Sequence, residues 1–135
     1  MMSHPPILNV ESIFQVLDYH AHHSANNIAI TAPDQEGLNY KNLKKHIEKL
    51  SITLNSIHYK KKPRIAIIMP NGPEMAVAFL STSSFATAAP LNPQYQAADL
   101  KFYFTDLDAD ALLSILKFLI FLLVDFKYLP RNSIF

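Results

Sequence analysis

The chain has 135 residues, the size of one small domain; half of them are hydrophobic and 17% are charged. This balance is typical of a packed globular fold and excludes the polar, highly charged composition of disordered chains. The formal net charge of +1 gives no large positive field, so nucleic acid is not an expected partner. Without cysteine there are no disulfides or thiolate sites, and residues 1–10 lack a secretory signal pattern, so the cytoplasm is the expected location.

The first part of the chain alternates helix, hairpin and helix patterns. Ser12 is a natural N-cap for a helix that runs toward His20, and residues 28–31 predict a strand that forms a hairpin with Leu38 after a polar turn. Asn39 is expected to cap a second helix with a lysine-rich outer face. Its inner face is a continuous apolar stripe: Leu43, Ile47, Leu50, Leu54 and Ile57.

The middle of the chain carries the strongest fold signal. Residues 65–69 (IAIIM) are apolar without alternation, which is typical of a parallel strand covered on both faces. Pro73 suits the first position of a helix and Glu74 offsets the helix dipole, so a third helix is expected to continue to about Phe85. Residues 88–91 then predict a short buried segment.

The last predicted elements complete an alternating pattern. Residues 97–107 form a helical pattern with a stripe at Leu100, Phe104 and Leu107, and residues 111–113 predict a buried strand. Together these elements predict an α/β fold, an incomplete layered arrangement of βαβ units over residues 1–114, with an exposed sheet edge that favours aggregation. Residues 115–135 are assigned to an apolar, divergent tail, whose apolar run is shorter than the roughly 20 residues that span a bilayer.

Two polar stretches invite a phosphate-binding interpretation. Asn71 and Gly72 precede a helix start, where free N–H groups can bind anions, but a single glycine favours a plain turn. The serine and threonine run at residues 81–84 has no glycine and lies inside an expected helix, which favours close packing. Neither stretch is assigned as an anion site.

Two further clusters invite a metal interpretation. Among His20, His22 and His23, the two histidines three residues apart share a helix face, but no third ligand lies at a suitable spacing. All three are therefore interpreted as surface polar residues. The alternating aspartates of residues 106–110 lack the glycine and the closing glutamate of a calcium loop, which favours a solvated turn between a helix and a strand. We therefore assign no catalytic, cofactor-binding or metal-binding residue.

Three stretches carry motifs of a known family. Residues 38–43 (LNYKNL) resemble its L-T-Y-x-E-L helix start, residues 64–74 (RIAIIMPNGPE) its R-V-A-I-x-L-P-N-S-P-E strand-turn-helix, and residues 90–95 (PLNPQY) its P-L-N-P-x-Y. By these motifs, their order and their separations, residues 12–113 resemble the AMP-forming adenylating enzymes, which include acyl-CoA synthetases. Asn42 departs from the pattern because an acidic residue there would complete a capping box.

The resemblance implies an acid–CoA ligase that uses ATP, magnesium and coenzyme A in its full-length form. The family holds the ATP phosphates in a Ser/Thr/Gly-rich loop ending in Pro-Lys, whereas this chain has no such loop and only two glycines, Gly37 and Gly72. We therefore expect an inactive N-terminal part that binds no cofactor itself, as a truncation or frameshift would produce. Two alternatives stay open: one half of a split ligase completed by a C-terminal fragment, and a non-catalytic module that contacts a membrane surface or a protein through its tail.

Overall fold

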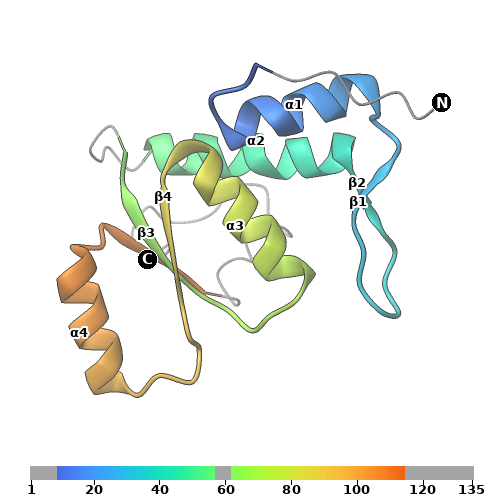
Figure 1. The fold of residues 1–135 in the computed structure, drawn as a ribbon. Helices are drawn as coiled ribbons and strands as arrows, with labels where there is room; N and C mark the ends of the chain where they lie inside the picture. The colour runs from blue at the N-terminus through green and yellow to red at the C-terminus, as the bar shows by residue number, and fades with distance from the viewer. Residues whose placement is uncertain (1–8, 57–61, 115–135) are drawn as a thin grey trace.

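The fold is described from a computed structural model over residues 9–56 and 62–114. Helices and strands alternate along this part of the chain, as the sequence predicts for an α/β fold (Figure 1). In chain order the elements are α1 (Ile13–His23), β1 (Ile28–Ile30), β2 (Leu38–Asn39), α2 (Tyr40–Ser56), β3 (Arg64–Ile68), α3 (Pro73–Phe85), β4 (Thr87–Leu91), α4 (Ala97–Leu107) and β5 (Ala111–Ser114). The predicted tail, residues 115–135, and residues 57–61 after α2 lie outside the described residues.

The central sheet is parallel and has the strand order β4-β3-β5. In the middle strand, Ala66 and Ile67 are fully buried, which confirms the prediction of a strand covered on both faces. Because β4 and β5 lie on opposite sides of β3, right-handed crossovers place α3 and α4 on opposite faces of the sheet. Figure 1 shows these two helices on either side of β3 and β4.

The strand β4 corrects one expectation. Residues 88–91 were expected to form a buried segment, but Thr87 and Pro90 are exposed and Ala88 and Ala89 are only half-buried. The reason is the position of β4, which pairs only with β3 in the described sheet. Proline lacks an N–H donor and is accommodated at such an outer strand.

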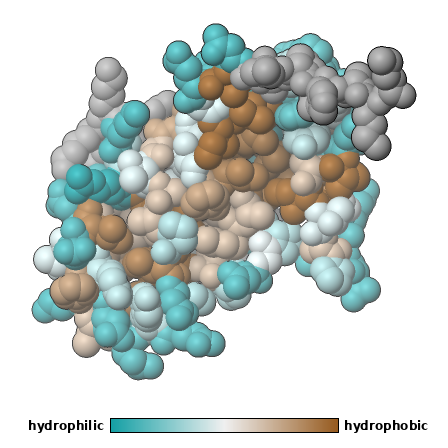
Figure 2. Space-filling model, viewed as in Figure 1, coloured by the Kyte–Doolittle hydropathy of each residue, from teal (hydrophilic) through white to brown (hydrophobic). Residues whose placement is uncertain are grey.

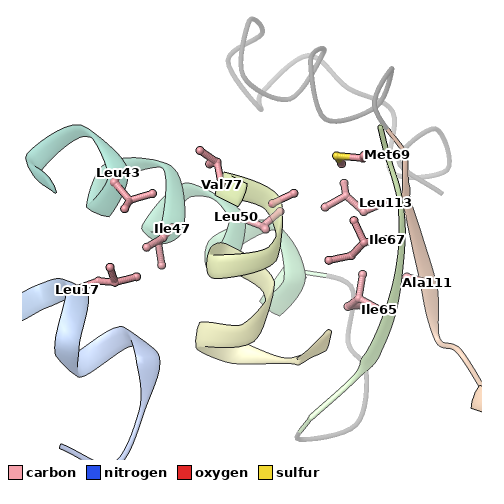
Figure 3. Packing of buried hydrophobic residues seen from close by; sticks show 11 residues of the cluster. Leu17, Leu43, Ile47, Leu50, Ile65, Ile67, Met69, Val77, Ala111 and Leu113 are labelled. Carbon is pink, nitrogen blue, oxygen red and sulfur yellow. The ribbon is translucent and has the colours of Figure 1, made fainter. Parts of the chain in front are cut away.

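The core lies between the sheet and the helices α1, α2 and α3. The stripe of α2 packs here as predicted through Leu43, Ile47 and Leu50, whereas the side chain of Leu54 and all of Ile57 lie outside the description. In Figure 3, Leu43 and Ile47 lie toward Leu17 and Val77, whereas Leu50 lies nearer the side chains of β3 and β5. The buried hydrophobic cluster contains Leu17, Leu43, Ile47, Leu50, Ile65, Ile67, Met69, Val77, Ala78, Ala111 and Leu113.

The predicted helix starts are confirmed by their capping contacts. The Ser12 side chain accepts a hydrogen bond from the Gln15 N–H at 3.2 Å, and Asn39 Oδ1 accepts one from the Asn42 N–H at 2.9 Å. Pro73 is the first residue of α3. These contacts satisfy N–H groups that have no partner inside the helix, so the starts are fixed locally. The predicted hairpin is also present, with β1 antiparallel to β2.

Candidate functional site

A hollow of about 140 Å³ lies where the β1–β2 hairpin meets α2 and the start of α3. Sequence reasoning did not find it, because its walls come from four separate elements. A usable signal was the spacing of His46, which lies three residues after Leu43 and four before Leu50 on the buried side of α2. The hollow is lined by Ile30, Ala32, Gln35, Glu36, Leu38, His46, Pro73, Glu74 and Val77.

The electrostatics of the hollow do not favour an anion. Burial, followed by the charge of Lys49, lowers the pKa of His46, so the imidazole is neutral at pH 7. The carboxylates of Glu36 and Glu74 then leave the lining acidic. Glu74 lies in the first turn of α3, where the helix dipole favours a negative charge. The hollow is therefore a poor place for a phosphate or a carboxylate ligand.

The turn at Asn71 and Gly72 is the place that the sequence suggested for anion binding. Gly72 is the N-cap residue of α3 and makes no side-chain cap. A Cβ built on Gly72 would lie 3.3 Å from Glu74 Oε2, so this carboxylate oxygen lies over the helix start. A negative charge there repels a phosphate, which supports the interpretation as a plain turn.

The run of small hydroxyl residues lies inside α3, as expected. Ser81 and Thr82 are 1% and 0% exposed, and neither hydroxyl has a hydrogen-bond partner among the described residues. Ser84 Oγ donates to the Leu80 carbonyl at 2.7 Å within the same helix. These side chains serve close packing and do not face a ligand.

The three histidines of α1 contact aromatic rings and a backbone carbonyl of this chain. The ring of His20 stacks on Tyr40 with centroids 4.9 Å apart, and that of His23 stacks on Tyr19 at 4.0 Å. His22 Nδ1 lies 2.8 Å from the Asp18 carbonyl oxygen. Within residues 9–56 and 62–114, no group of three or more His, Asp or Glu side chains is arranged to hold a metal ion.

Of the three aspartates predicted in the turn, Asp106 lies inside α4, whereas Asp108 and Asp110 form the turn between this helix and β5. The turn also makes specific contacts. Asp110 Oδ2 accepts a hydrogen bond from the Arg64 N–H at 2.9 Å, and the Asp110 N–H donates to the Arg64 carbonyl at 2.8 Å. Arg64 Nη1 also donates to the Leu107 carbonyl at 3.1 Å and lies 3.7 Å from Asp108 Oδ2. The turn therefore fastens β5 to the start of β3.

A scan against protein-family models places this fold in a family. Residues 17–127 match the model described as AMP-binding enzyme, so the chain belongs to that family and corresponds to an N-terminal part of its members. A curated relative is the oxalate–CoA ligase of Saccharomyces cerevisiae, 32% identical over 96 residues that cover 65% of this chain and 18% of that protein. Because the family match continues past residue 114, the division there into domain and divergent tail stays a prediction.

Solved structures have the same fold. The N-terminal subdomain of Klebsiella oxytoca NpsA, in complex with 3-hydroxyanthranilyl-AMSN, matches 78% of this chain and 27% of its own, with a TM-score of 0.69 and 19% identity. The inhibitor-bound N-terminal domain of Mycobacterium tuberculosis FACL13 gives the same coverage and TM-score at 21% identity. The chain thus spans about a quarter of these structures. No helix within its described residues is long and apolar enough to cross a membrane.

Proposed function

We propose that this chain forms the first layers of the N-terminal domain of an AMP-forming acid–CoA ligase and does not activate an acid by itself. The observation that carries the proposal is the extent of the structural match, which covers 78% of this chain but only 27% of the NpsA subdomain. The rest of that subdomain has no counterpart in the part of this chain that the match covers. The role of the chain is then to support the domain rather than to perform its chemistry.

The parent reaction joins a carboxylic acid to coenzyme A in two steps. The acid first attacks ATP to give an acyl-adenylate and pyrophosphate, and coenzyme A then displaces AMP from the acyl group. This chemistry requires donors that hold the triphosphate and its magnesium ion.

The described residues do not fit the triphosphate. The helix start at Gly72 offers one glycine, and the Glu74 carboxylate lies over it. No step of the reaction is therefore assigned to this chain.

Pyrophosphate exchange tests the proposal directly. The 135-residue chain is incubated with ATP, magnesium, labelled pyrophosphate and a panel of carboxylic acids that includes oxalate. We expect no label in ATP above the background of a protein-free mixture, whereas the complete S. cerevisiae oxalate–CoA ligase serves as the positive control. Acid-dependent exchange by the chain alone would overturn the proposal.

The split-ligase alternative adds a second arm to the same assay. If the chain is one half of a divided enzyme, exchange should appear when a C-terminal ligase fragment is added. The open order of the sheet supports this alternative, because β4 and β5 are each paired only with β3 in the described chain. Absence of exchange in every such mixture would remove the split-ligase alternative and leave the supporting role in place.

The tail alternative rests on the sequence alone, because residues 115–135 lie outside the description. It predicts that the full chain binds lipid vesicles or a protein and that a variant lacking residues 116–135 does not. If the full chain and the shortened variant bind equally, the tail alternative is wrong. The cytoplasm stays the predicted location.

A further inference from the structure

The helix α4 presents two different faces. Leu100, Phe104 and Leu107 recur at helical spacing and are half-buried. A neighbouring stripe of the same helix combines aromatic and acidic side chains at the same kind of spacing: Asp99, Phe102, Tyr103 and Asp106. No residue of α4 is fully buried, and Phe102 is 63% exposed. Figure 2 shows hydrophobic and hydrophilic residues side by side at this end of the molecule.

The aromatic rings of this stripe form a small platform with the tyrosine before the helix. The rings of Tyr95 and Tyr103 stack with centroids 5.0 Å apart and planes 15° apart. Phe102 meets Tyr103 edge to face at 5.3 Å. The hydrogen bond with Tyr95, with smaller contributions that include the charges of Asp99 and Asp106, raises the pKa of Tyr103, so its hydroxyl stays protonated.

The charge of this region is opposite to that of the chain as a whole. Residues 95–107 contain two aspartates and one lysine, a net charge of −1, whereas the complete chain carries +1; Asp108 and Asp110, beyond the helix, contact Arg64. Asp99 and Asp106 are exposed within the aromatic stripe. The surface is therefore complementary to a positively charged partner rather than to another copy of itself.

We propose that Tyr95, Asp99, Phe102, Tyr103 and Asp106 form a docking surface for an arginine-bearing segment of the rest of the ligase domain. A guanidinium group stacks on aromatic faces and pairs with carboxylates through two parallel hydrogen bonds. This surface offers both kinds of contact within two turns of one helix. The inference rests on the proposed function, because the occupant belongs to the part of the family's domain that the structural match does not cover.

The position of α4 supports this occupant. On one face of the sheet, α2 and α3 cover β3 with fully buried side chains, whereas α4 on the other face buries none. The NpsA subdomain that shares this fold is almost four times as long as the part that matches, since the match covers 27% of it. The missing portion is therefore large enough to supply a covering segment.

A binding experiment tests the surface. The probe is the S. cerevisiae oxalate–CoA ligase without the stretch that matches this chain, titrated into the full 135-residue chain at low and high salt. We expect Phe102→Ala, and separately the pair Asp99→Asn with Asp106→Asn, to raise Kd by about tenfold or more, as is usual for central aromatic and charged contacts. The Asp99→Asn substitution keeps a side-chain oxygen that can accept the Gln96 N–H, so the helix cap survives. Phe79→Ala, at a 37% exposed position on α3, is the matched control and should leave Kd within about twofold.

Hydrogen exchange on the complex locates the contact and separates the outcomes. Protection of residues 95–107 that both surface variants remove would support the inference. Binding that protects other residues, or that neither variant weakens, would overturn the docking surface and leave the proposed function standing. No binding by the wild-type chain would instead count against the proposed function, and the docking inference would fail with it. Dimerisation of the chain that Phe102→Ala abolishes would identify a second copy as the occupant and overturn the inference.

Discussion

The two faces of the β4-β3-β5 sheet are covered to different extents. On one face, α3 packs on the sheet and α2 packs on α3, and Leu43, Ile47 and Ala78 of these helices are almost fully buried. On the other face, α4 contributes no buried residue, and Phe102 is 63% exposed. The first face closes its core with residues of this chain, whereas the second holds an ordered helix that still carries an exposed aromatic surface. The difference indicates that stability comes from one face and that the other face is available for association.

The largest effect should come from a pair of substitutions on the two faces. Ile67→Ala removes a fully buried side chain from the central strand and should lower the free energy of unfolding by about 2–5 kcal/mol. Phe102→Ala removes more atoms but should change it by no more than about 0.5 kcal/mol, because the ring is mostly exposed. Urea unfolding followed by circular dichroism measures both values. Similar losses would contradict the comparison of the two faces.

A second substitution tests the contact that joins β5 to the start of β3. Asp110→Ala removes the acceptor of the Arg64 N–H, so β5 loses a contact with the start of β3, and stability should fall by about 1 kcal/mol. Asp106→Asn, at an exposed position on α4, should change stability by less than about 0.5 kcal/mol. Urea midpoints of the two variants distinguish these results. A loss in Asp106→Asn as large as in Asp110→Ala would show that general charge, and not this hydrogen bond, is responsible.

A third substitution should increase stability on the closed face only. Thr82→Val keeps the shape of the side chain and removes a buried hydroxyl that has no hydrogen-bond partner in the described structure. We expect a gain of up to about 1 kcal/mol in the free energy of unfolding. On α4, the Thr105 hydroxyl donates to the Lys101 carbonyl at 2.8 Å and is exposed, so Thr105→Val should give no gain. Equal gains would indicate that helix propensity, rather than burial, sets the effect.

The smallest effect concerns pH at the hairpin side of the closed face. Burial lowers the pKa of His46 in the folded chain, so the unfolded chain binds a proton more readily. The contribution of His46 to the free energy of unfolding should therefore be fully present above pH 6.5, the ordinary histidine pKa. It should be lost as the pH falls from 6.5 toward the lower pKa of the folded chain. Glu36 and Glu74 across the hollow and Lys49 on the same helix act on this equilibrium. His46→Gln should flatten the decrease between pH 7 and pH 5, measured by urea unfolding, and His22→Gln should not.

Much of the fold could be predicted because the responsible contacts are local. Ser12 and Asn39 cap helices through N–H groups three residues ahead, and Pro73 starts α3 by its own fixed geometry. The apolar run of β3 likewise indicates a strand buried on both faces. Residue type and short spacing carry all of this information.

The candidate site could be predicted only in part. Residues 81–84 lie inside α3 and the α2 stripe is buried, as predicted, whereas the absence of an anion site at residues 71–72 stays a prediction. His46 was missed because its hollow combines the hairpin, α2 and α3. The contact of Asp110 with Arg64 was missed because the two residues are 46 positions apart. Such contacts depend on the path of the whole chain.

Capping, periodicity and motifs act over a few residues, so the order of helices and strands, the helix starts and the family could be predicted from the residues alone. The three-dimensional arrangement was needed to show that β4 is an outer strand beside β3, that α3 and α4 lie on opposite faces and that the acidic aromatic stripe of α4 stays exposed. The physical reason is that strand order and burial depend on pairings between distant residues. A local pattern shows which side chains can be buried, and the arrangement of the layers decides which of them are.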